Sequence, residues 1–288
     1  MKLALGTVQF GLAYGIANSQ GQVGQDEARA ILSMARAAGM DTLDTAVNYG
    51  TSEECLGTCG IADWQVISKL PACPEGEADI IGWAERQVVV SLDRLAVPRL
   101  RGLLLHRPAQ LLGPDGDALF QALQALKRLG LVERIGVSIY DPAELEPLLA
   151  RFPLDLVQAP FNVLDRRLIS SGWMNRLAEM QVELHVRSVF LQGLLLMPAS
   201  RRPAAFSRWQ SIWQLWTQWL AQTDQTPVEA CLRDALAQQG IARVIIGVDS
   251  TVQFEEILRA AVGPNIEVPA ALHSDDIDLI NPSRWRIP

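Results

Sequence analysis

Short, nearly continuous apolar runs recur along the chain, and stretches in which apolar residues have helical spacing lie between them. Eight of the runs have the length of a strand, and each is bounded by Gly, Pro, Asp or a charged residue. They cover residues 2–7, 42–46, 65–69, 102–106, 134–139, 156–160, 183–189 and 243–248. Runs that are apolar throughout are typical of parallel strands covered on both faces.

Helix start and stop signals mark the intervening stretches. Acidic or hydroxyl residues begin several of them, as at Asp26 and Ser52, and Gly39 ends the first. The spacing predicts further helices at 78–95, 115–129, 142–151, 170–180, 226–239 and 251–261.

Eight strands that alternate with about as many helices predict the α/β class and a single (β/α)8 barrel, the TIM barrel. A doubly wound open sheet is the competing fold, but it requires a Gly-rich turn that leads from the first strand into a helix. The residues after Thr7, Val-Gln-Phe-Gly-Leu-Ala-Tyr-Gly, lack that glycine spacing. The closed barrel is therefore favoured.

We expect one domain over residues 1–288, because no linker or low-complexity tract interrupts the pattern. A helical insertion at about 200–226 carries Trp209, Trp213, Trp216 and Trp219. These spacings place the four indoles on one helical face. That face either packs on the outside of the barrel or forms a lid or dimer surface.

Composition narrows the class of protein. With 49% hydrophobic and 20% charged residues, the chain is not disordered, and a net charge of −7 without a basic run argues against nucleic-acid binding. Four cysteines are too few for a disulfide scaffold, and Met1 and Lys2 precede no apolar stretch of signal or membrane-span length. We expect a cytoplasmic protein with reduced thiols, no membrane or nucleic-acid partner, and a monomeric or weakly homo-oligomeric state.

Four polar residues lie at or just after the ends of adjacent predicted strands, at the barrel end where active sites of this fold lie. They are Asp44, Tyr49, Lys69 and His106. Each alone has a structural explanation, as a turn cap, a packed aromatic, a solvated strand end or a core histidine. Together, an ammonium beside a phenol stabilises the phenolate, a carboxylate orients the amine, and an imidazole orients a substrate oxygen. This is the equipment for proton transfer during carbonyl reduction.

Over almost its whole length the sequence resembles the aldo-keto reductases. The likeness rests on Gly6-Thr-Val-Gln-Phe-Gly11, on Asp41-Thr-Leu-Asp44 through Tyr49-Gly50 to Gly57, and on Ile67-Ser-Lys69, Leu104-Leu-His106, Ile135-Gly-Val-Ser138, Val157-Gln158 and Gln192-Gly-Leu-Leu195. The resemblance implies a catalytic tetrad of Asp44, Tyr49, Lys69 and His106, with Tyr49 as the general acid. It also implies reduction of an aldehyde or ketone by hydride from NADPH or NADH, without a metal.

The resemblance further implies which residues bind the cofactor. They are Gly6, Thr7, Ser138, Gln158, Arg187, Ser188, Gly247, Asp249, Ser250, Gln253 and Glu256. Ser138 and Gln158 match the family's nicotinamide-amide contacts, but Ile139 replaces its Asn. Arg187 stands where a stacking Tyr is common, and a planar guanidinium can also stack on a ring. There its charge would favour the neutral, reduced nicotinamide.

The end of the predicted cofactor site that would hold the adenosine has no basic residue for a 2′-phosphate. Asp249 would instead accept a hydrogen bond from a free 2′-hydroxyl, while the helix that begins at Thr251 offers backbone N–H groups to a phosphate. NADH and NADPH therefore both stay open. His106, His185 and His273 are far apart, and Cys55 and Cys59 lack partners, so no metal site is expected.

Two other functions compete with the reductase. The chain could be a non-catalytic or weakly active regulatory, cofactor-binding subunit on the same fold. It could also be a sugar isomerase or lyase in which Lys69 forms a Schiff base, although a nearby Asp44 favours a charged lysine.

Overall fold

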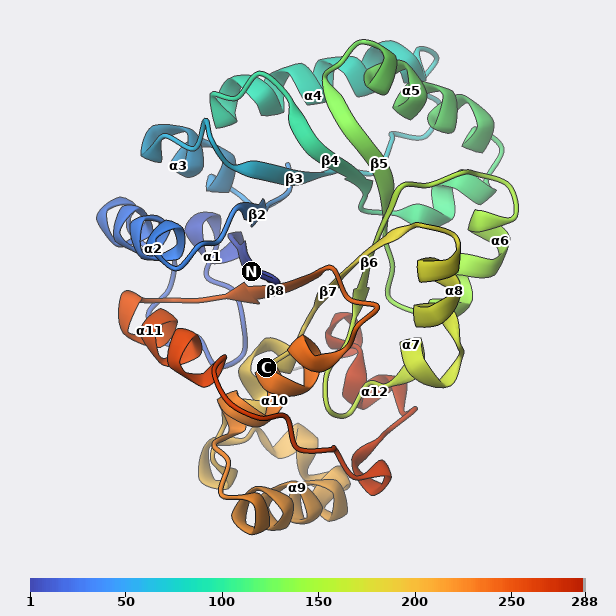
Figure 1. Ribbon diagram of the computed structural model, residues 1–288. Helices are drawn as coiled ribbons and strands as arrows, with labels where there is room; N and C mark the ends of the chain where they lie inside the picture. Colours follow the sequence, from blue (N-terminus) through green and yellow to red (C-terminus); the bar gives the residue numbers. More distant parts are fainter. Residues whose placement is uncertain (287–288) are drawn as a thin grey trace.

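The computed structural model describes residues 1–286, and within them eight parallel strands close into a barrel in chain order, with β1 paired to both β2 and β8. The strands form the ring at the centre of Figure 1. They are β1 Leu3–Gly6, β2 Thr42–Asp44, β3 Gln65–Leu70, β4 Leu100–Leu105, β5 Val132–Ser138, β6 Leu156–Pro160, β7 Glu183–Arg187 and β8 Arg243–Gly247. The predicted (β/α)8 barrel is confirmed.

Helices surround the ring (Figure 1). The α-helices are α1 Val8–Gly11, α2 Gln25–Ala37, α3 Ser52–Cys59, α4 Ile80–Leu95, α5 Gly116–Arg128, α6 Leu145–Leu149, α7 Arg167–Ser170, α8 Trp173–Glu179, α9 Gln210–Thr223, α10 Pro227–Ala237, α11 Thr251–Ala260 and α12 Ile277–Ile280. Short 3-10 segments lie at Pro108–Leu112, Pro142–Glu144, Leu191–Leu196, Ala199–Arg201, Ala204–Trp209, Ala270–Leu272 and Pro282–Arg284. No helix in residues 1–286 is both long and apolar enough to span a membrane.

Each predicted strand is present, with ends that differ by at most two residues. The helix predicted at 142–151 begins as the 3-10 turn Pro142–Glu144, which Asp141 caps, and continues as the short α6. The strand predicted at 183–189 ends at Arg187, since Ser188 adopts a left-handed φ of 62° that no strand continues through.

Strand register places the polar residues in the upper layers of the barrel interior. Gly6 pairs with Asp44, Asp44 with Ile67, and Lys69 with Leu104. Below them, Ile67, Leu104 and Leu156 form a small apolar core inside the ring. Because alternate side chains point to opposite faces, the remaining strand residues pack outward against the helices.

The tryptophan-bearing insertion forms α9, which lies outside the ring beside α10 (Figure 1). All four indoles are buried, between 2% and 9% exposed. Trp213 Nε1 donates to the Phe206 carbonyl at 2.9 Å and Trp216 Nε1 to the Leu195 carbonyl at 3.3 Å. The indoles therefore pack inward, so this face is not the exposed apolar patch predicted for a lid or dimer surface.

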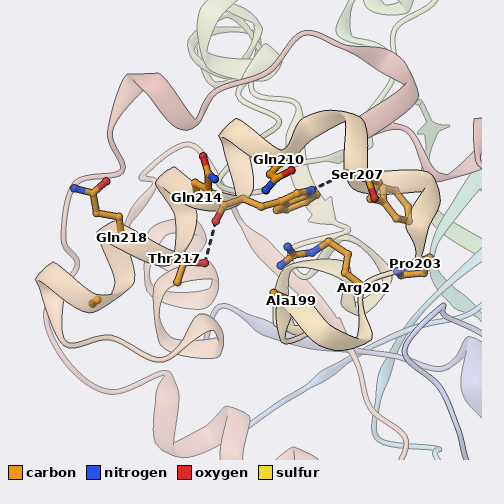
Figure 2. Close-up of a pocket in the computed structure, with 11 residues that line it drawn as sticks. Ala199, Arg202, Pro203, Ser207, Gln210, Gln214, Thr217 and Gln218 are labelled. Atoms are coloured by element: carbon orange, nitrogen blue, oxygen red, sulfur yellow. Dashed lines mark hydrogen bonds between the residues drawn. The ribbon is translucent and has the colours of Figure 1, made fainter.

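The outer face of α9 is polar. Gln210, Gln214 and Gln218 border a groove whose other wall contains Arg202 (Figure 2). The Arg202 guanidinium stacks on Trp213 at 4.0 Å from the ring centroid.

Candidate active site

A cavity of about 550 Å³ opens at the carboxyl ends of the strands. Twelve of the predicted site residues line it: Gly6, Thr7, Asp44, Tyr49, His106, Ser138, Arg187, Ser188, Gly247, Asp249, Gln253 and Glu256. Lys69 and Gln158 lie behind this lining, in contact with Asp44, whereas Ser250 caps α11 by accepting a hydrogen bond from the Gln253 N–H.

Asp44 and Lys69 form a buried ion pair at the base of the cavity. The Lys69 Nζ lies 2.6 Å from Asp44 Oδ1 and also donates to the Thr45 carbonyl at 2.9 Å. Lys69 is 1% exposed and Asp44 4%. Burial alone would lower the pKa of Lys69, but the adjacent Asp44 and Tyr49 reverse this and raise it. The ion pair favours the charged ammonium, which argues against the Schiff-base role.

Tyr49 lies in the loop between β2 and α3, and close backbone contact fixes its position. A Cβ on Gly11 would come within 1.8 Å of the Tyr49 carbonyl oxygen, and Gly50 has a φ of 56° beside Gly11. Only glycine fits the close approach, and it adopts the left-handed backbone readily. The Lys69 Nζ lies 5.1 Å from the centroid of the Tyr49 ring, so the ammonium faces the phenol.

His106 follows β4 and contacts Tyr49 edge to face, with ring centroids 6.0 Å apart. Its Nδ1 is buried and has no hydrogen-bond partner among residues 1–286. Burial first, then the positive charges of Lys69 and Arg187, lowers its pKa to about 4. The imidazole is therefore neutral at physiological pH, and a neutral ring can position a carbonyl oxygen without adding charge.

The predicted nicotinamide contacts occupy β5 and β6. Ser138 lines the cavity, while the buried Gln158 accepts from Ser138 Oγ at 3.4 Å and donates to Asp44 Oδ2 at 2.6 Å. Gln158 thus holds the second oxygen of the carboxylate that pairs with Lys69. Ile139 is fully buried and presents its backbone carbonyl to Arg187.

At the start of α11, one of the backbone N–H groups predicted to contact a phosphate already has a partner. The Thr251 N–H donates to Glu27 Oε1 at 2.6 Å, so an acidic side chain of α2 already occupies this helix terminus. Asp249 accepts from Asn18 Nδ2 at 3.2 Å, and Asp249 and Glu256 line the cavity nearby. Burial raises the pKa of Asp249. Acidic groups therefore dominate the side of the cavity formed by β8 and α11.

Several residues that support the site were not predicted. The Ser52 hydroxyl donates to the Thr7 carbonyl at 2.8 Å and lies 3.1 Å from Thr45 Oγ1, so a buried hydroxyl cluster ties β1 and β2 to the start of α3. Tyr14 and Tyr140 also line the cavity. Tyr140 directly follows the predicted run 134–139, so the rule that identified the other strand-end residues would have found it.

Metal-binding groups are absent from the described part of the chain, where no cluster of three or more His, Cys, Asp or Glu side chains is placed to hold an ion. All four cysteines are free thiols. Burial raises the pKa of the Cys55 thiol to about 11.

Comparison with known proteins now gives the class. Residues 2–267 match the model of the aldo/keto reductase family. The match covers well over half of the chain, and the chain belongs to this family.

Individual relatives are distant. Oxidoreductase YdhF of Escherichia coli is 29% identical over 163 residues, a stretch that covers 50% of this chain and 54% of that protein, so the similarity spans about half of the relative's length. Among solved structures, aldo-keto reductase AKR11C1 of Bacillus halodurans in its holo form is similar with a TM-score of 0.73 and 22% identity over 92% of this chain and 88% of that one. PA4992 of Pseudomonas aeruginosa gives a TM-score of 0.66 and 24% identity over 90% and 89%. At these identities the two structures support the fold.

Proposed function

We propose that the protein reduces an aldehyde or ketone to an alcohol with NADH or NADPH, and that Tyr49 supplies the proton. The observation that carries this proposal is the arrangement of the Asp44–Lys69 pair below the Tyr49 ring, with His106 at its edge. An acid, an amine, a phenol and an imidazole at one cavity wall perform proton transfer to a carbonyl oxygen.

Each residue of the tetrad has a separate task. Asp44 keeps Lys69 charged and in place, and Gln158 fixes the second carboxylate oxygen. The Lys69 ammonium stabilises negative charge that develops on the Tyr49 oxygen as its proton leaves. The neutral His106 orients the substrate oxygen toward Tyr49.

The cavity suits the nicotinamide end of the cofactor, which would supply hydride when bound. Its volume lies in the range of small-molecule sites. Gln9 Oε1 is buried without a partner among residues 1–286, and a ligand N–H or hydroxyl would satisfy it. Ser138, Ser188, Gly247, Asp249, Gln253 and Glu256 would hold the cofactor.

We favour NADH over NADPH. Asp249, Glu256 and Glu27 lie where β8 and α11 meet the cavity, and carboxylates repel a 2′-phosphate but accept a hydrogen bond from a 2′-hydroxyl.

The test is loss of absorbance at 340 nm with small aldehydes, for the wild type and for Tyr49→Phe. The variant keeps the ring that packs against His106 but has no proton to transfer, so turnover should fall at least 10³-fold, within the range of acid–base contributions of about 10²–10⁴. Its cofactor dissociation constant serves as the folding control. Equal rates in both proteins would refute the mechanism. Cofactor binding by the wild type without turnover of any carbonyl would instead favour the regulatory, cofactor-binding subunit.

A further inference from the structure

Arg187, at the end of β7, is the only lysine or arginine among the described residues that line the cavity. It forms no ion pair with an Asp or Glu in residues 1–286, in contrast to Lys69, whose charge Asp44 neutralises. Asp249 and Glu256 line the same cavity without contacting it. The cavity therefore contains one uncompensated guanidinium.

The guanidinium is held in place by neutral groups. It lies over the Tyr140 ring with Cζ 4.5 Å from the centroid. Nη2 donates to the Ile139 carbonyl at 3.0 Å and Nη1 to Ser188 Oγ at 3.2 Å. These contacts use two of the five N–H donors of an arginine. The stacked ring and the two bonds fix the plane of the group, and the remaining donors are free for a ligand.

The charge of Arg187 acts on the groups that would react. Burial and then Lys69 and Arg187 lower the pKa of His106, and Arg187 opposes the increase that burial causes in the pKa of Tyr14. Arg187, Tyr49 and His106 line one cavity of about 550 Å³, so a small substrate whose carbonyl lies at Tyr49 can also reach Arg187.

We propose that Arg187 selects carbonyl substrates that carry a carboxylate group, which it binds through its free N–H donors. An arginine fork matches a carboxylate in shape and charge, and a half-buried cation without a counter-ion gains most from one. This inference rests on the proposed reductase activity, because it names the substrate class of the same site.

The experiment compares matched substrates. We would measure kcat/KM for 4-oxobutanoate, its neutral methyl ester and butanal, and for 5-oxopentanoate against pentanal, because the second pair extends the spacing by one methylene. The wild type should prefer at least one oxoacid to its uncharged partner by about tenfold or more. In Arg187→Met that preference should fall by about 10- to 100-fold, as expected for a lost charge-assisted hydrogen bond. Arg187→Lys keeps the charge without the fork and should retain part of the preference.

Arg202 provides the matched control. It also stacks on an aromatic ring, that of Trp213, and donates to a backbone carbonyl, that of Met197, but it lies in the groove beside α9 (Figure 2). The Arg202→Met variant should keep the wild-type ratio of kcat/KM for the oxoacid to kcat/KM for its uncharged partner.

Three results would overturn the proposal. One is a wild type with no preference for either oxoacid, and another is a ratio that changes less than about threefold in Arg187→Met. The third is an equal loss on charged and neutral substrates together with weaker cofactor binding, which would assign Arg187 to the cofactor. The reductase proposal is separate: it fails if no carbonyl is reduced, whereas Tyr49-dependent reduction of butanal without an oxoacid preference refutes only the role of Arg187.

Discussion

Replacing His106 with glutamine removes a side chain whose pKa the fold lowers from 6.5 to about 4. Because the folded state disfavours the imidazolium, the unfolded chain binds more protons between these two pH values. The free energy of unfolding therefore falls as the pH is lowered through this window, by up to about 1.36 kcal/mol per pH unit. Between pH 7.0 and 4.5 the contribution of His106 is about 2.4 kcal/mol. Glutamine does not titrate, so the variant lacks this term.

The assay is urea unfolding of the wild type and of His106→Gln at pH 7.0 and at pH 4.5. At each pH the free energy of unfolding of the variant is subtracted from that of the wild type, and the readout is how much this difference changes between the two pH values. Taking this difference cancels the other titrating groups, among them Glu53 and Asp234, whose pKa values burial raises. His273 is exposed, so His273→Gln is the control and should change the pH dependence much less. Identical pH dependence in wild type and His106→Gln would show that the imidazole is not held neutral, and its proposed role as an uncharged orienting group would fail.

Two further predictions concern the charges of the site. Lys69→Met leaves Asp44 buried without its counter-ion, so we expect a loss of about 3–5 kcal/mol in the free energy of unfolding. The double variant Lys69→Met/Asp44→Asn should recover part of this loss. A loss below about 1 kcal/mol in the single variant would contradict the buried pair. For the cofactor, fluorescence titration of the wild type should give a lower Kd for NADH than for NADPH. Asp249→Lys should change the ratio of the two Kd values in favour of NADPH by about tenfold or more, or about 1.4 kcal/mol. Tighter binding of NADPH than of NADH by the wild type would contradict the proposed role of Asp249 and Glu256.

The strands were predictable because each is a short apolar run that the barrel buries on both faces, so its composition differs sharply from its surroundings. Their ends shift by a residue or two, as at β7, where the backbone of Ser188 turns away from the strand although Val189 is apolar. Short helices such as α1 and α7 have a single turn each and show no usable periodicity.

The convergence of the polar strand-end residues was predictable for a different reason. In a parallel barrel, residues that end neighbouring strands meet at one mouth, so Asp44, Lys69 and His106 converge even though they are far apart in sequence. Side-chain partners could not be predicted in this way. The family resemblance implies Gln158 as a ligand of the nicotinamide, but it does not indicate that the Gln158 amide also binds Asp44. Nor does the sequence indicate that Glu27 reaches the start of α11 from a helix more than two hundred residues away.

The charges of the cavity divide according to the strands that carry them, and this division links the two proposals. Around the reacting carbonyl, two cations, Lys69 and Arg187, face one carboxylate, Asp44, so the local field favours negative charge on the substrate oxygen and on a substrate carboxylate. Where β8 meets α11, the charged residues that line the cavity are the carboxylates Asp249 and Glu256. A substrate with a carboxylate matches the positive charge around the reacting carbonyl, and a dinucleotide without a 2′-phosphate matches the carboxylates where β8 meets α11. A 2′-phosphate would place negative charge beside Asp249 and Glu256, and an uncharged substrate would leave Arg187 without a counter-ion. The preference for NADH and the preference for oxoacids therefore follow from the same distribution of charge.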